Sequence, residues 1–238
     1  MACVTKEARS YRNQTQRTME ITWRGERDPR ISRIMNIILL GPQGSGKGVQ
    51  SELLSKHLRA PHVSVGDLIR EDIQRGTATG IAIKSIVEKG GLAPDDIVLK
   101  IIEKKLTECS RGAIFDGFPR TLTEAEWLDE QITVDKVIEL YIPDSLAIAR
   151  ISSRTQCEKC HRIYGKDIPP KKKGICDNCG GKLSTRADDN PAAVKKRLKL
   201  YHEETEPLFE YYKPRNVVCK VNAGGKPNEV MKLILKCL

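Results

Sequence analysis

The stretch N-I-I-L-L-G-P-Q-G-S-G-K-G, residues 36–48, decides the fold. Residues 37–40 are a short apolar run, typical of a strand that is buried on both faces. A glycine-rich segment follows, and a helical pattern begins near Gly46 and continues to about Leu58. This order brings backbone N–H groups and a helix N-terminus together, where they can bind phosphate. The pattern G-x-x-x-x-G-K therefore predicts a phosphate-binding loop, with Lys47 reaching the β- and γ-phosphates.

The loop departs from the strict signature, which places Ser or Thr directly after the lysine. Gly48 and Val49 follow Lys47 here, and the absent hydroxyl is the group that usually binds Mg²⁺. Asp116, at the end of a later predicted strand, could instead hold the waters around Mg²⁺. The alternative is an ordinary strand–helix turn in which the glycines are incidental.

Apolar strand patterns alternate with helical patterns along most of the chain. This alternation predicts an α/β protein with a parallel sheet and helices on both of its faces. The predicted strands lie at 36–40, 62–65, 112–116, 136–142 and 216–221, and the helices at 46–58, 66–76, 79–89, 95–108, between the third and fourth strands, and at 143–153, 190–213 and 227–237.

The composition describes a soluble globular protein, with 39% hydrophobic and 30% charged residues among 238. No apolar run approaches the roughly 20 residues of a membrane span, and none resembles a secretory signal. We therefore expect a cytoplasmic protein without a membrane partner.

The net charge of +10 requires that nucleic acid or phosphorylated small molecules be considered as partners. Residues 1–34 carry eight basic and four acidic residues and lack apolar periodicity. They are interpreted as a basic, disordered extension of the P-loop α/β core at 35–238. A targeting presequence, and a natural start at Met35, are the alternatives.

Four of the eight cysteines form the pattern C-x₂-C-x₁₅-C-x₂-C. Two such pairs supply four thiolates for one tetrahedral, structural zinc ion, with no open position for catalysis. The surrounding segment 155–187 interrupts the α/β rhythm and is interpreted as an inserted zinc ribbon. For an intracellular protein, metal or free thiols are expected before disulfides, so the remaining cysteines are interpreted as small, partly buried residues. The predicted ligands are Cys157, Cys160, Cys176 and Cys179, and the others are Cys3, Cys109, Cys219 and Cys237.

Three further segments, D-G-F-P-R at 116–120, G-D-L-I-R at 66–70 and S-T-R-A-D-D-N at 184–190, accompany the loop. In this order and spacing they resemble the adenylate kinase family of nucleoside monophosphate kinases. The family loop reads G-x-x-G-x-G-K-G-T-Q, so Gly48 fits the family pattern and Val49 departs from it. The resemblance covers about 36–238 and includes the four-cysteine lid and a T-R-x-D-D motif.

The resemblance implies Mg²⁺-dependent transfer between ATP and AMP by a monomer, with insert 64–93 receiving the monophosphate and insert 155–187 closing as a lid. Arg150 and Arg154, four residues apart, are expected on one helical face, and Asp188 and Asp189 are expected to orient arginines. The implied catalytic residues are Lys47, Asp116, Arg120, Arg150, Arg154, Arg186 and Arg197. The implied ATP site is Gly44, Ser45, Gly46, Lys47, Gly48, Val49, Arg150, Arg154 and Lys226. The implied AMP site is Val65, Arg70, Leu92, Ala93, Gly117, Arg120, Glu124, Arg186 and Arg197.

Three substitutions at ligand-facing positions, Val49, Val65 and Glu124, leave the acceptor base open. By resemblance, Val65 and Glu124 stand where the family usually has a threonine and a glutamine that contact AMP. An ionised glutamate only accepts hydrogen bonds, so it suits guanine or a cytosine amino group better than adenine. A kinase for GMP, CMP or UMP is therefore one alternative. A nucleotide- or RNA-binding protein without efficient transfer is another, although the lysines at 171–173 are interpreted as a solvated loop and nucleic acid is not the expected partner.

Overall fold

The computed structural model describes residues 35–109 and 112–238, which form two compact units. One unit is Ser153–Arg186, and the other contains the rest of the described chain. The extension expected at 1–34 lies outside the described residues.

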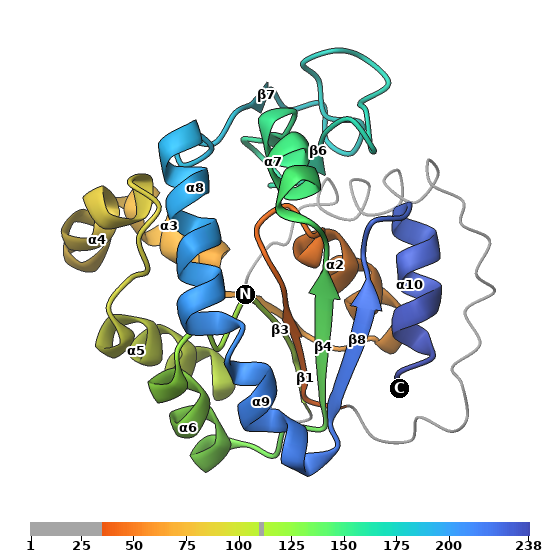
Figure 1. Ribbon diagram of the computed structural model, residues 1–238. Helices are drawn as coiled ribbons and strands as arrows, with labels where there is room; N and C mark the ends of the chain where they lie inside the picture. The colour runs from red at the N-terminus through yellow and green to blue at the C-terminus, as the bar shows by residue number, and fades with distance from the viewer. Residues whose placement is uncertain (1–34, 110–111) are drawn as a thin grey trace, which may run out of the picture. The chain divides into compact units, whose positions relative to one another are not determined.

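The larger unit is built on a parallel five-stranded sheet. The strands β1 (Ile37–Leu40), β2 (His62–Ser64), β3 (Ile114–Asp116), β4 (Lys136–Tyr141) and β8 (Val218–Asn222) lie in the order β2-β3-β1-β4-β8 (Figure 1). Ile38 and Leu40 of β1 point into one hydrophobic core, and Ile37 and Leu39 point into the other. A strand with a core on each face must be apolar throughout, as the sequence of β1 predicts.

Helices cover both faces of this sheet and confirm the predicted α/β class. Among the described residues, no helix has both the length and the hydropathy that a bilayer span requires. The helices α2 (Lys47–Leu58), α7 (Asp144–Ser152), α8 (Pro191–Leu200) and α10 (Pro227–Leu235) contribute to one core. The other core receives α3 (Val65–Arg75), α4 (Ala78–Glu88), α5 (Asp95–Leu106), α6 (Leu122–Gln131) and α9 (Leu208–Tyr212).

Side-chain caps fix where several of these helices begin. The hydroxyl oxygens of Ser64, Thr77 and Thr121 accept hydrogen bonds from the backbone N–H three residues later, as N-cap residues commonly do. Gly80 lets α4 pack directly on α3, because a Cβ there would overlap the carbonyl of Asp72. These features hold segment 64–93 as a pair of helices beside the sheet.

The prediction of one regular helix at 190–213 is wrong. After α8 the chain forms a π-helical turn at Tyr201–Thr205, then α9 and a 3₁₀ turn at Lys213–Arg215. Pro207 explains the change, because it has no N–H to donate and its ring would clash with the carbonyl four residues earlier. The Glu206 N–H instead bonds the Tyr201 carbonyl at 2.8 Å, which closes the wider turn.

The expectation that Arg150 and Arg154 share one helical face is also wrong. Helix α7 ends at Ser152, before Arg154. The Ser152 hydroxyl donates to the carbonyl of Ile148 at 2.8 Å, a side-chain bond that competes with regular helix geometry. Arg154 consequently belongs to the smaller unit.

The smaller unit is a three-stranded antiparallel sheet with very little apolar core. Its strands β5 (Thr155–Cys157), β6 (Ile163–Tyr164) and β7 (Leu183–Ser184) lie in the order β6-β5-β7. Its buried core cluster consists of Cys157, Tyr164 and Cys176, with Cys160, Cys179 and Leu183 partly buried against it. So small a core needs a further source of stability.

A disulfide between Cys219 and Cys237 corrects the expectation of free thiols. Cys219 lies on β8, and Cys237 lies just beyond α10, which packs against that strand. Their Cα atoms are 6.0 Å apart, within the range that a disulfide spans. Because the two cysteines are not in a recognisable motif, only the packing of α10 on β8 reveals the pair. Cys109 is a free, partly buried thiol, and Cys3 lies outside the described residues.

The Cys219–Cys237 disulfide should stabilise the larger unit. Closing a loop across 18 residues removes unfolded-state entropy worth about 3 kcal/mol. We therefore expect Cys219→Ser, or reduction of the wild type, to lower the free energy of unfolding by about this amount in urea titrations. Cys109→Ser is the control, because its thiol is free. Equal stability of oxidised and reduced wild type would contradict the assignment.

Candidate active site

The phosphate loop joins β1 to α2 with a geometry that only glycine allows at key positions. Gly44 and Gly46 have φ angles of 86° and 90°, in the left-handed region where a side chain is strained. A Cβ on Gly44 would also lie 2.7 Å from the carbonyl oxygen of Ala147 on α7. Gly46 is the N-cap residue of α2. The loop is thus fixed against α7 while the N–H groups of the first turn of α2 remain available to an anion.

Lys47 is turned toward the backbone of the phosphate loop, and Ser45 is buried in it. The Lys47 ammonium donates to the carbonyls of Gly41 and Pro42 at 2.5 and 2.9 Å. Ser45 is 2% exposed, and its hydroxyl has no hydrogen-bond partner among the described residues. A buried, unpartnered hydroxyl normally has a ligand or water to satisfy it, which fits a bound phosphate. Gly48 and Val49 lie in the first turn of α2, where Val49 contributes a backbone N–H but no hydroxyl.

Arg120 is the centre of a second group of charges. It follows Asp116, the last residue of β3, and its Nε donates to the Gly117 carbonyl at 2.8 Å. Burial lowers the pKa of Arg120 and the neighbouring Arg70 cation adds to this effect, whereas the carboxylates of Glu124, Asp116 and Asp188 oppose it. A desolvated cation beside a second cation favours an anionic ligand such as phosphate.

Arg70 on α3 and Arg197 on α8 are each paired with a carboxylate. Arg70 of α3 bonds Asp67 at 2.5 Å, and Arg197 of α8 forms an ion pair with Asp188. Such pairs orient a guanidinium before a ligand arrives. The adjacent Asp189 accepts a hydrogen bond from Gln43 of the phosphate loop at 3.1 Å. The segment of the T-R-x-D-D motif therefore contacts both an arginine and the loop.

Arg150 holds the turn that follows β8. Its two terminal nitrogens donate to the carbonyls of Ala223, Gly224 and Gly225 at 2.8, 3.2 and 3.2 Å. Sequence reasoning assigned Arg150 only to phosphate and did not find these contacts. Lys226 comes next as the exposed N-cap residue of α10.

Among the predicted acceptor-site residues, Val65 and Ala93 are buried and Leu92 is partly buried. Val65 is the first residue of α3. The positive φ of Gly117, 67°, places the Arg120 side chain close to it, since a Cβ there would lie 3.0 Å from the guanidinium. Glycine is therefore required where the chain turns from β3 toward Arg120.

Glu124 has a structural contact that sequence reasoning missed. The residue is 3% exposed. Its carboxylate accepts a hydrogen bond from the backbone N–H of Arg120 at 2.7 Å, while its own backbone N–H donates to the Thr121 hydroxyl. The pattern T-x-x-E at 121–124 resembles a capping box and could have revealed this role. Burial raises the pKa of Glu124 to about 7, assisted by Asp95 and opposed by the hydrogen bond and the charge of Arg120.

Arg154 and Arg186 belong to the smaller unit. There, the Nε of Arg186 donates to the side-chain oxygen of Gln156 at 2.7 Å. Arg154 directly precedes β5, and Arg186 is the last residue of the unit. The two arginines therefore stand at the two ends of the segment that holds the cysteine quartet.

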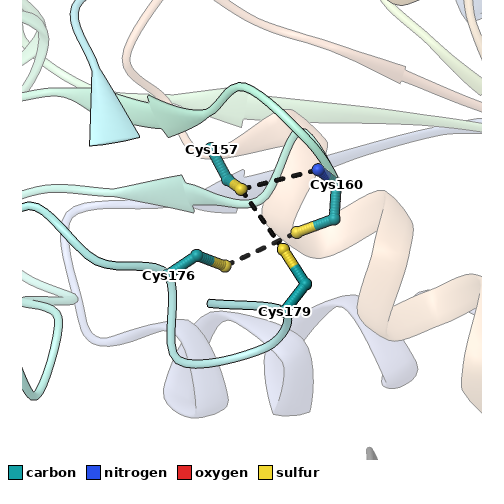
Figure 2. A group of neighbouring side chains, drawn as sticks. All are labelled: Cys157, Cys160, Cys176 and Cys179. Atoms are coloured by element: carbon teal, nitrogen blue, oxygen red, sulfur yellow. Dashed lines mark hydrogen bonds between the residues drawn. The ribbon is translucent and has the colours of Figure 1, made fainter. Parts of the chain in front are cut away.

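The four predicted cysteine ligands converge in this unit, as Figure 2 shows. Their sulfur atoms all lie within 4.8 Å of one another. Backbone N–H groups of Lys159 and Asn178 point at the sulfurs of Cys157 and Cys176, both at 3.4 Å. Gly181 allows the chain to pass close by, because a Cβ there would lie 2.8 Å from the Cys157 sulfur. A four-thiolate donor set of this kind fits a closed tetrahedral site for a metal such as zinc.

The larger unit combines a phosphate loop with partly buried and paired arginines. Such a site supports phosphoryl transfer, which depends on positioned cations rather than on a general base. The fold and the site together define a P-loop phosphotransferase.

Comparisons with known proteins identify the family. The model of the adenylate kinase family matches residues 39–217. The adenylate kinase of Caldicellulosiruptor bescii is 41% identical over 215 residues, which cover 86% of this chain and 99% of that protein. Those of Clostridium tetani and Borreliella burgdorferi are each 42% identical, over 86% of this chain and 98% of theirs. The chain belongs to the adenylate kinase family, and the predictions of family, phosphotransferase class and function are confirmed.

The cysteine site generates a prediction about metal content. The purified protein should contain about one zinc ion per chain, and Cys157→Ser should lose it. Because metal binding folds such a unit, the variant should exchange its amide hydrogens faster across 153–186 only. Cys109→Ser should retain the metal. A wild type that is free of zinc but protected in this segment would contradict the site.

Because Glu124 is buried, the free energy of unfolding should depend on its protonation and therefore on pH. The raised pKa of Glu124 means that the folded state favours the neutral acid. The resulting contribution to the free energy of unfolding is fully present below about pH 4.5 and is lost as pH rises through about 7. Glu124→Gln removes this loss and should exceed the wild type in free energy of unfolding at pH 8, by up to about 3 kcal/mol. The exposed Glu126→Gln on the same helix is the control. A variant less stable than wild type at pH 8 would contradict the assignment.

Proposed function

We propose that the protein catalyses the reversible, Mg²⁺-dependent reaction ATP + AMP ⇌ 2 ADP. The observation that carries this proposal is the group of Arg70, Arg120 and Arg197 with Asp116 in one unit with the phosphate loop. One phosphate site serves the donor, and the arginines supply a second one for the acceptor. The named relatives, which are adenylate kinases, support AMP as that acceptor.

In this proposal the loop binds the donor and the arginines bind the acceptor. The N–H groups at the start of α2 and the Lys47 ammonium bind the β- and γ-phosphates. Arg70 and Arg120 hold the phosphate of AMP, while Arg197 stabilises the charge on the phosphoryl group in flight. Arg150 keeps the turn at 223–225, and with it Lys226, beside the phosphate loop.

Asp116 fits the role of holding the waters around Mg²⁺. Its carboxylate is partly buried at the carboxyl end of β3, and β3 pairs with β1, which leads into the phosphate loop. Ligands of α/β sheets bind at this edge, and Mg²⁺ prefers oxygen ligands while keeping several waters. When bound, the ion neutralises charge that develops on the transferred phosphate.

We propose that the unit Ser153–Arg186 closes as a lid and holds zinc as a structural ion. Lid closure would bring Arg154 and Arg186 to the phosphates and exclude water, so that ATP is not hydrolysed. Its zinc would be needed because the unit buries few apolar residues of its own. The proposed acceptor-binding segment is 64–93, and the proposed functional state is a monomer.

Glu124 sets the choice of base in this proposal. A neutral carboxyl has one donor and one acceptor, so it can pair with adenine as a glutamine amide does. The ionised form only accepts, and it suits guanine. Since the pKa of Glu124 is raised to about 7, the neutral form is available near neutral pH. GMP is the second candidate acceptor, favoured by the ionised form.

The function is tested by a coupled assay with AMP, GMP, CMP and UMP between pH 6 and 8.5. AMP should be the preferred acceptor, and its KM should rise above about pH 7 as Glu124 ionises. Glu124→Gln should remove this rise and improve AMP use at pH 8, and Glu126→Gln should retain it. Turnover of GMP or CMP but not AMP would contradict the acceptor. Turnover of none would favour a binding protein.

A further inference from the structure

Both polar atoms of the Arg120 main chain are held by buried side chains. The N–H donates to the Glu124 carboxylate at 2.7 Å, and the carbonyl accepts from the hydroxyl of Thr205 at 3.0 Å. Glu124 and Thr205 are 3% and 6% exposed. The Glu124 contact is local, whereas Thr205 is 85 residues away in the sequence. The Thr205 contact therefore depends entirely on the tertiary fold.

The π-helical turn directs the Thr205 hydroxyl toward Arg120. A threonine inside a helix commonly bonds the carbonyl four residues earlier, which here is that of Tyr201. That carbonyl instead accepts the Glu206 N–H in the wider turn. Thr205 bonds the Arg120 carbonyl in its place. Pro207, two residues later, is the reason that the regular helix cannot continue.

The contact joins two parts of the acceptor site. Thr205 lies eight residues after Arg197, and the π-helical turn at Tyr201–Thr205 continues directly from the end of α8 at Leu200. The hydroxyl therefore ties the Arg120 main chain to the helical segment that carries Arg197. A guanidinium that must meet a phosphate needs placement to within about 0.5 Å. A main-chain anchor limits how far Arg120 can shift.

We infer that Thr205 is a positioning residue for the acceptor monophosphate, which it affects by fixing the main chain of Arg120. The inference rests on the proposed function, in which Arg120 binds the phosphate of AMP. Thr205 itself touches no reacting atom in this account. Loss of the Thr205 hydroxyl should weaken the binding of AMP and not that of ATP, because the phosphate loop is held in place by other residues.

Thr205→Val tests the inference, because valine keeps the branched shape and removes only the hydroxyl. The KM and the dissociation constant for AMP should rise about tenfold, which corresponds to one lost hydrogen bond. The KM for ATP should stay close to that of wild type. Steady-state kinetics with each substrate varied, together with calorimetric titration of AMP, give these values.

Two further variants separate positioning from a structural role. Thr205→Ser restores the hydroxyl and should recover most of the affinity for AMP. Thr107→Val is the matched control. It removes an exposed hydroxyl just after the end of α5, which donates to the Lys104 carbonyl at 2.8 Å. In an Arg120→Lys background, Thr205→Val should add little to the loss of affinity for AMP, because both changes act through one group.

The outcomes distinguish this inference from the proposed function. An unchanged AMP affinity in Thr205→Val overturns the positioning role. Equal rises in the KM for AMP and ATP with a lower melting temperature, or full additivity with Arg120→Lys, also overturn it. AMP binding by the wild type without turnover overturns the proposed function alone. No AMP binding by the wild type overturns both.

Discussion

The close approach of the phosphate loop to the backbone behind it is the constraint on which the rest of the structure depends. Gly44 lies against the backbone of Ala147, and a Cβ on Gly41 would overlap the carbonyl of Leu140. Both contacts require glycine, and both fix the start of α2 at the carboxyl edge of the sheet. Every cation of the proposed site acts relative to that fixed point. A shift of the loop would separate the donor phosphates from Arg120 and Arg197.

Around this point the chain concentrates charge that it has removed from water. Arg120 is flanked by Arg70 and by three carboxylates, and Arg197 is paired with Asp188. Ion pairs of this kind add little to the stability of the fold, because the cost of removing the charges from water offsets their attraction. Their value lies in holding cations ready for an anion, because preorganised charge stabilises a phosphoryl group without rearrangement. The buried Glu124 reduces the stability of the fold above neutral pH, because burial disfavours its ionised form.

The sequence predicted the features that depend on local patterns. The apolar run before Gly41 predicted the central strand, and the paired C-x₂-C motifs predicted the cysteine cluster. Features that depend on packing were missed, namely the Cys219–Cys237 disulfide and the contacts of Arg150 with the turn at 223–225. Pro207 could have predicted the break in the helix at 190–213, but not that Thr205 would reach Arg120. Such contacts require knowledge of where distant segments meet.

In the proposed reaction, the terminal phosphoryl group of ATP passes to the monophosphate held by Arg120. The most direct measurement follows ATP labelled in its γ-phosphate, incubated with unlabelled AMP and Mg²⁺, by chromatography of the products. The label should appear in the β-phosphate of ADP, with little inorganic phosphate. Label released mainly as inorganic phosphate, or retained in ATP while AMP is bound, would contradict it.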